Sequence, residues 1–253
     1  MSEKLFSIIT PVYNGEQYIE ETIKSVLSQT YRDYEYVIVD SESKDRTIDI
    51  INKYKNDVHK VICEKDNGMY DAIDKAIKLS NGKYILWINS DDILNNKKTL
   101  ENIANLLNKK PSIEWLTGRV SFLYENRKKI FSFLPYIYPK YFIKKGWAHD
   151  CAWGFIQQES TVFSKELYFK VGGFNKKLKM AGDFDLWRKF SHETNLYTCN
   201  IKIGVQRKWK GQMQQDLKFY YNEINKKRCS FKFLKFIRIL FSLIIFPFIL
   251  TRK

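Results

Sequence analysis

Two adjacent carboxylates, Asp91 and Asp92, directly follow an apolar stretch, Tyr84 to Ile88, that is typical of a β-strand. Hard oxygen ligands at a strand end can bind Mg²⁺ or Mn²⁺, and such an ion usually also holds the phosphates of a substrate. The alternative is that one of the two aspartates only caps a loop or the following helix. The pair by itself leaves both interpretations open.

Three further polar segments border expected strands or helices. Asp40 ends an apolar strand and begins a turn, up to Thr47, whose side chains can hydrogen-bond a base or a ribose. Gly68 lies in a polar loop before a helix, where the backbone can approach a phosphate closely. Asp183 stands at another helix start, where it can act as a general base or as a cap. Ordinary strand–helix turns would explain the first two segments equally well.

Alternating strand and helix signals would position these groups. Strands are expected at 5–10, 36–39, 61–63 and 84–88, and helices around 19–27, 47–54, 72–77 and 100–107. This βαβαβα order predicts an α/β fold with a mostly parallel, Rossmann-like sheet and helices on both faces. Ligands bind beyond the carboxyl ends of the strands in such sheets. Asn14, with Gln17 three residues on, also predicts a capped start for the first helix.

The pattern changes beyond Pro111. We expect strands at 113–123, 130–134 and 161–164, a long loop at 135–158, and helices at 165–171 and 183–192. The four cysteines and three histidines form no zinc pattern, and no signal peptide is recognisable. These features predict reduced thiols in a cytosolic protein.

The charge is concentrated at the C-terminal end. The 253-residue chain carries a net charge of +15, of which residues 202–253, with 13 basic and two acidic side chains, hold +11. A protein that binds nucleic acid over its whole surface is thereby disfavoured. Lys232, Lys235 and Arg238 share one helical stripe in an otherwise apolar segment, 231–250, whose uncharged run is shorter than the roughly 20 residues of a membrane span. This predicts an amphipathic helix on an anionic membrane surface; a helix packed on protein is the alternative.

Taken together, the motifs resemble those of family-2 glycosyltransferases of the GT-A fold, in order and in spacing, over about residues 5–215. The matching segments are Ser7 to Asn14, Ser25 to Tyr31, Glu35 to Thr47, Asp66 to Ala72, Asn89 to Asp92, Gln157 to Thr161 and Gly182 to Trp187. Each motif alone is weak, but the set is specific.

The resemblance implies an inverting transfer of a sugar from a nucleotide diphosphate, expected to be UDP, to a lipid-linked or polysaccharide-precursor acceptor. It places the nucleotide sugar at Pro11, Tyr13, Asp40, Ser43, Asp66, Gly68, Tyr70 and Asp91. A divalent metal, Mn²⁺ or Mg²⁺, would be held by Asp92 and Asp91 and would neutralise the leaving diphosphate. Asp183 would take the proton of the acceptor hydroxyl. The acceptor side would include Gln158, Glu159, Trp187 and Trp209.

Four departures from the family pattern stand out. Ser41 replaces an aspartate that much of the family has, and Asp74 and Ala76 replace an asparagine and a glycine. Asn89 replaces the first carboxylate of the D-x-D motif, and Trp209 stands where a late motif has a histidine that can reach the metal. These departures predict a metal site with fewer protein ligands and with Trp209 packed over it.

We therefore expect a nucleotide-sugar-binding part at 1–112, an acceptor-binding part of the same domain at 113–212, and a basic tail at 213–253. The enzyme would be peripheral, at the cytoplasmic face of the plasma membrane, and would not bind nucleic acid. A nucleotidyltransferase is an alternative, although it would ordinarily have a Gly-rich, basic loop where Thr10 to Gly15 stands. A non-enzymatic membrane- or nucleic-acid-binding module would not need Asp91, Asp92 and Asp183 at ligand-facing ends.

Overall fold

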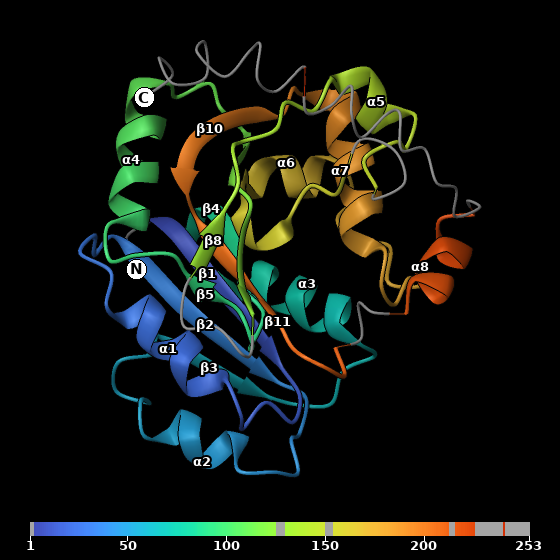
Figure 1. Ribbon diagram of the computed structural model, residues 1–253. Coiled ribbons are helices and arrows are strands. Elements are labelled where there is room, and N and C mark those ends of the chain that lie inside the picture. The colour runs from blue at the N-terminus through green and yellow to red at the C-terminus, as the bar shows by residue number, and fades with distance from the viewer. Residues whose placement is uncertain (1–2, 125–129, 150–153, 213–215, 226–239, 241–253) are drawn as a thin grey trace.

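The computed structural model describes residues 3–124, 130–149, 154–212, 216–225 and 240 (Figure 1). The strands are β1 (Lys4–Val12), β2 (Tyr34–Asp40), β3 (Lys60–Cys63), β4 (Gly82–Trp87), β5 (Ile93–Leu94), β6 (Trp115–Arg119), β7 (Ser121–Tyr124), β8 (Ile130–Ser132), β9 (Thr161–Ser164), β10 (Tyr197–Lys202) and β11 (Gly204–Lys208). The helices are α1 (Ile19–Leu27), α2 (Thr47–Asn52), α3 (Met69–Leu79), α4 (Thr99–Lys109), α5 (Lys140–Lys144), the short η1 (Gln158–Ser160), α6 (Lys165–Lys170), α7 (Gly182–Glu193) and α8 (Leu217–Glu223).

Seven strands of the described chain form the main sheet, in the order β10-β6-β9-β4-β1-β2-β3. β1 pairs in parallel with both β2 and β4, β2 pairs in parallel with β3, and β10 pairs in parallel with β6. β9 alone runs antiparallel, between β4 and β6. The predicted mostly parallel α/β sheet is confirmed, and β9 begins beside the carboxyl end of β4.

The central strands bury both faces, because successive side chains point to opposite sides of the sheet. Ile8 and Leu86 enter one core with α1 and α4, whereas Ile9 and Ile85 enter a second core with α3, α6 and α7. Figure 1 shows these two sets of helices on opposite sides of the sheet. Each such side chain contributes roughly 1.5–3 kcal/mol by burial. Continuous apolar strands thus position the polar loops that follow them.

A second, four-stranded sheet in the described residues has the order β5-β11-β7-β8. β11 pairs antiparallel with β5 through Val205 and Ile93, which brings the chain after residue 204 against the loop that follows β4. The strand expected at 113–123 divides into β6 and β7, and α5 lies in the expected long loop. β10 and β11 have no counterpart in the sequence-based prediction.

The predicted helix cap at Asn14 is wrong. α1 begins at Ile19, and Asn14 has a left-handed backbone with φ of 49°. The Asn14 side chain instead accepts a hydrogen bond from the N–H of Lys44 at 2.8 Å. The loop after β1 therefore stabilises the neighbouring loop after β2 rather than its own helix.

The part of the chain after residue 212 is described only in part. Asp216 is the N-cap of α8, and its carboxylate accepts from the N–H of Phe219 at 3.0 Å. Lys232, Lys235 and Arg238, and with them the predicted amphipathic tail, lie outside the described residues. Within the residues that are described, none of the helices has the length and apolarity to cross a membrane.

Candidate active site

The loops after β1 and β2 are joined by hydrogen bonds. The backbone N–H groups of Asn14, Gly15 and Glu16 donate to side chains of the 41–47 turn over 2.8–3.0 Å. Asp40 is fully buried, and its carboxylate accepts from the N–H and the hydroxyl of Ser43. Asp40 thus shapes the turn, and its predicted contact with a nucleotide stays a prediction.

The remaining predicted nucleotide-side residues differ in exposure. Tyr13 is 61% exposed after β1, whereas Pro11 is buried within that strand. Asp66 is half-buried and accepts from the N–H of Gly68 at 2.8 Å. Gly68 has φ of 116°, a conformation that side chains with a Cβ rarely adopt. Tyr70 is 3% exposed, and its ring packs against Gly182 at the start of α7. Tyr70 is therefore buried beneath the predicted site and does not line its surface.

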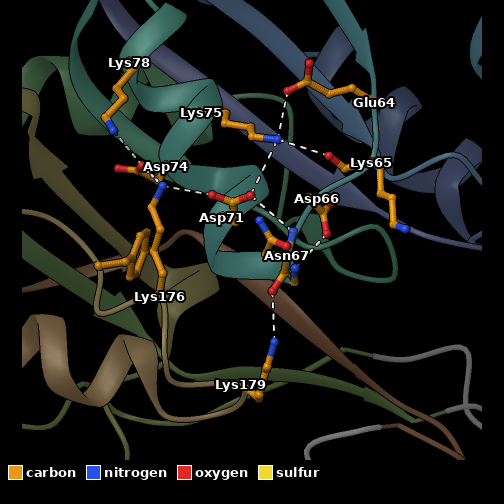
Figure 2. A network of polar contacts seen from close by, with 12 residues as sticks. Glu64, Lys65, Asp66, Asn67, Asp71, Asp74, Lys75, Lys78, Lys176 and Lys179 are labelled. Atoms are coloured by element: carbon orange, nitrogen blue, oxygen red, sulfur yellow. Dashed lines mark hydrogen bonds and ion pairs between the residues drawn. The ribbon is translucent and has the colours of Figure 1, made fainter.

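A network of ion pairs attaches α3 to the segment that precedes α7 (Figure 2). The ammonium of Lys176 lies 2.9 Å from the carboxylate of Asp71 and 2.7 Å from that of Asp74, and both carboxylates are buried. The hydrogen bond from Lys176 lowers the pKa of Asp71 to about 2, against the opposing effect of burial. Lys179 also donates to the carbonyl of Asn67 at 2.9 Å. The polar loop at 64–71 and the chain leading to Asp183 are thus held together.

Asp91 and Asp92 face different surroundings. Asp92 is 1% exposed, and its carboxylate accepts from the N–H of Arg207 at 2.9 Å and from the amide of Asn89 at 3.3 Å. Burial, reinforced by the charges of Asp91 and Glu159, raises the pKa of Asp92 well above its ordinary value. Asp91 is half-buried and the more accessible of the two. The structure therefore turns Asp92, the expected principal metal ligand, inward and leaves Asp91 at the surface.

Trp209 lies directly against Asp91. Its indole N–H donates to Oδ2 of Asp91 at 2.8 Å, and the amide of Gln212 donates to the same oxygen at 2.8 Å. The Trp209 ring also contacts Tyr18, with centroids 5.6 Å apart. The other oxygen of Asp91, Oδ1, accepts no hydrogen bond within the described chain. Both donors hold this carboxylate in one orientation.

A second carboxylate, Glu159, is fully buried in η1. Neither of its oxygens has a hydrogen-bond partner among the described residues, and the same is true of the amide of Gln158. Burial raises the pKa of Glu159 to about 7, and the charges of Asp183 and Asp91 act in the same direction, whereas Lys208 opposes it. Burial in turn lowers the pKa of Lys208. The negative charges of Asp91 and Asp183 therefore both favour the protonated form of the buried Glu159.

Asp183 occupies the first turn of α7, where its carboxylate accepts from the N–H of Phe184 at 2.7 Å. Burial raises its pKa to about 6, and Glu223 adds to this rise. Such a carboxylate is ionised near neutral pH but is a stronger base than an ordinary aspartate, as proton abstraction requires. Ala181, not Asp183, is the N-cap residue of α7, and the role of Asp183 as the general base stays a prediction.

Trp187 does not line a cleft. It is 3% exposed and stacks on Trp115, with centroids 5.6 Å apart, and it also packs edge-on against Phe163. Its expected place on the acceptor side is therefore not supported, because its helical spacing turns it into the core beneath α7.

The metal-ligand set predicted from the sequence is reduced in the structure. No group of three or more His, Cys, Asp or Glu side chains able to hold a metal occurs within the described parts of the chain. Oδ1 of Asp91 accepts no hydrogen bond among the described residues, and Asp91 is only half-buried, whereas the equally unpartnered carboxylate of Glu159 is fully buried. Mg²⁺ and Mn²⁺ sites that include substrate phosphates need only one or two protein carboxylates, so the donor set fits such an ion when a diphosphate completes it.

The comparison with protein-family models decides the family. Residues 7–166 match the model of glycosyl transferase family 2. The chain belongs to glycosyltransferase family 2. Among curated relatives, the uncharacterized glycosyltransferase RP339 of Rickettsia prowazekii is 30% identical over 209 residues, which is 76% of this chain and 60% of that protein. The Escherichia coli enzyme WfaP, a UDP-Glc:α-D-GlcNAc-diphosphoundecaprenol β-1,3-glucosyltransferase, is 34% identical over 149 residues, 56% of this chain and 50% of WfaP.

Solved structures show the same fold. Staphylococcus aureus TarS in complex with UDP-GlcNAc has a TM-score of 0.68 at 23% identity, over 83% of this chain and 60% of the TarS chain. The mannosyltransferase PcManGT of Pyrobaculum calidifontis, in complex with GDP-Man and Mn²⁺, has a TM-score of 0.64 at 19% identity, over 100% of this chain and 73% of that chain. These likenesses confirm the GT-A fold. The chain spans about three fifths of the length of RP339 and half that of WfaP.

Several site residues were not found from the sequence. Lys176 pairs with Asp71 and Asp74, and Glu223 of α8 contacts the chain just before Asp183. Lys208 acts on Glu159 through its charge. The departure of Asp74 from the family pattern was a signal for the first of these contacts. No sequence signal indicated the roles of Lys208 and Glu223, because their partners are distant in the sequence.

Proposed function

We propose that this glycosyltransferase moves a sugar from a UDP donor, with inversion, to a lipid-linked or polysaccharide-precursor acceptor. The observation that carries the proposal is the position of two carboxylates: Asp91 comes shortly after the carboxyl end of β4, and Asp183 follows Gly182, which packs on Tyr70 in the first turn of α3 after β3. The printed activity of WfaP, a UDP-glucose enzyme with a diphosphoundecaprenol-linked acceptor, supports this choice of donor and acceptor.

In the proposed mechanism, Asp183 accepts the proton of the acceptor hydroxyl as the oxygen attacks C1 of the donor sugar. The bond from C1 to the diphosphate breaks on the opposite side, so the anomeric configuration inverts. Asp91 would hold Mn²⁺ or Mg²⁺ through Oδ1, while Trp209 and Gln212 keep the carboxylate in place. When bound, such an ion neutralises the charge of the leaving diphosphate.

The nucleotide would lie over the loops that follow β1, β2 and β3. Tyr13, the most exposed of the predicted nucleotide-side residues, can stack on a base or a sugar. Ser43 and Asp66 belong to turns that border this surface.

The test measures transfer from UDP-sugars to GlcNAc-diphosphoundecaprenol in the presence of Mn²⁺, with the anomeric configuration of the product read by NMR. Asp183→Asn should lower the rate about 10²- to 10⁴-fold, as expected for loss of a general base. Asp185→Asn is the matched control, because Asp185 lies on the same helix and pairs with Lys189 at 3.0 Å. Full activity of Asp183→Asn, or a product with retained configuration, would overturn the mechanism.

The predicted location, peripheral at the cytoplasmic face of the membrane, is part of the same proposal. The basic and apolar sequence of 231–253 supports it, since such a segment binds anionic headgroups. Deletion of 231–253 should move the protein from the membrane fraction to the soluble fraction. Unchanged fractionation would contradict membrane docking by this segment.

A further inference from the structure

α8 packs against the beginning of the helix that carries Asp183. Tyr220 of α8 contacts Phe184 and Phe155 with ring centroids 6.4 and 5.4 Å apart, and Ala181 is buried in the same small cluster. Figure 1 shows α8 beside the lower end of α7, although more than twenty residues of chain, including β10 and β11, separate the two helices in the sequence. The apolar contact therefore attaches a late part of the chain to the proposed catalytic helix.

Glu223, at the end of α8, makes the polar part of this contact. Its carboxylate accepts hydrogen bonds from three successive backbone N–H groups, those of Lys179, Met180 and Ala181. The bonds to Met180 and Ala181 measure 2.8 and 2.9 Å. Hydrogen bonds to a charged acceptor contribute about 1.5–3 kcal/mol each, and a carboxylate is also stabilised near the start of a helix. One side chain thus fixes the backbone that leads into Gly182 and Asp183.

The same segment is held from its other side by Lys176 and Lys179, through the contacts of Figure 2. Gly182 packs so closely on the ring of Tyr70 that a Cβ at this position would lie 2.6 Å from the ring. The position of Asp183 is therefore set by α3 on one side and by α8 on the other.

We propose that Glu223 is a positioning residue for glycosyl transfer, which holds the backbone at 179–181 so that the Asp183 carboxylate stands correctly toward the acceptor hydroxyl. The inference rests on the proposed role of Asp183 as the base. Glu223 also acts on that base through its charge. Among the described residues, the ionisable groups that act on Asp183 are Tyr70 from α3, Glu159 from η1 and Glu223 from α8. The burial of Asp183 and the negative charge of Glu223 both raise the pKa of Asp183.

Two variants separate the geometric effect from the charge effect. Glu223→Ala removes every acceptor, whereas Glu223→Gln keeps the size and one acceptor oxygen but loses the charge. Asp216→Asn is the matched control, because it removes a negative charge from the start of α8 without touching 179–181. All are made in the full chain.

The first readout, amide hydrogen exchange, needs no substrate. In Glu223→Ala the amides of 179–181 should exchange roughly 10- to 100-fold faster, the factor that corresponds to a lost charged hydrogen bond.

The second readout is UDP release from the UDP-sugar that the wild type turns over. Glu223→Ala should lower kcat about 10- to 100-fold with little change in the donor KM, as a misplaced reactive group does. Glu223→Gln should recover part of kcat and move the acid limb of the pH profile to lower pH.

Unchanged exchange at 179–181 in Glu223→Ala, or a pH profile of Glu223→Gln identical to that of Asp216→Asn, would overturn the inference. Full activity of Asp183→Asn would instead show that the proposed function is wrong. In that case the exchange experiment still decides whether Glu223 holds the segment.

Discussion

Lys176→Met tests the ion pairs that connect the donor-side loop to the segment before Asp183. The Lys176 ammonium is the first cause of the low pKa of Asp71, about 2 against an ordinary 3.8. That difference corresponds to roughly 2.5 kcal/mol of folding free energy, at about 1.4 kcal/mol per pKa unit. Lys75 and the N–H of Asn67 still contact Asp71 in the variant. We therefore expect Lys176→Met to lose about 1–2 kcal/mol at pH 7.

The sign of the pH dependence follows from the lowered pKa. A carboxyl group whose folded pKa is depressed stabilises the fold above its unfolded pKa and loses that contribution as the pH falls through the folded value. The difference between wild type and Lys176→Met should thus be complete above about pH 5 and should shrink between about pH 4 and pH 2. Urea unfolding at a series of pH values measures it.

Lys177→Met is the matched control, because Lys177 is the exposed neighbour in the same segment and makes no ion pair among the described residues. It should leave the free energy of unfolding within about 0.5 kcal/mol of wild type. Equal losses in both variants, or a loss in Lys176→Met that is the same at pH 7 and pH 2, would refute the assigned role of the Lys176 ion pairs.

Three further predictions concern the site itself. Trp209→Phe keeps an aromatic ring but removes the donor to Asp91, so the Mn²⁺ concentration for half-maximal UDP release should rise about 10- to 100-fold; an unchanged value contradicts the orienting role. Gly182→Ala places a Cβ 2.6 Å from the Tyr70 ring, and kcat should fall roughly 10-fold or more while the fold persists by circular dichroism; wild-type kcat would show that this contact does not matter. Since Asp183 must be ionised to act as a base, kcat/KM should decline below about pH 6, and a profile flat to pH 4.5 would refute this.

The sequence predicted the central sheet because its signal is local. The continuous apolar residues of β1, β2 and β4 fill two cores, and Asp91 lies in the loop that follows β4, so the apolar pattern and the position in the chain located both. The strands β10 and β11 were missed, since they are stabilised by pairing with distant segments rather than by their own pattern.

The sequence does not predict which side chains point into the core and which point toward the site. Asp91 and Asp92 are adjacent, yet Asp92 is buried and accepts a hydrogen bond from the N–H of Arg207, 115 positions away, which no local pattern indicates. The sequence predicts Trp187 on the acceptor side, whereas it packs in the core, because an aromatic side chain suits both a sugar and a core. Glu223 bonds to backbone groups 42–44 positions away and carries no motif of its own.

The most direct test of the account measures UDP release from a panel of UDP-sugars, with Mn²⁺ and with EDTA, by wild type, Asp91→Asn and Asp183→Asn. The account predicts release by wild type with Mn²⁺, and loss of release with EDTA and in both variants. Undiminished release in EDTA together with full activity of Asp91→Asn and Asp183→Asn would contradict it.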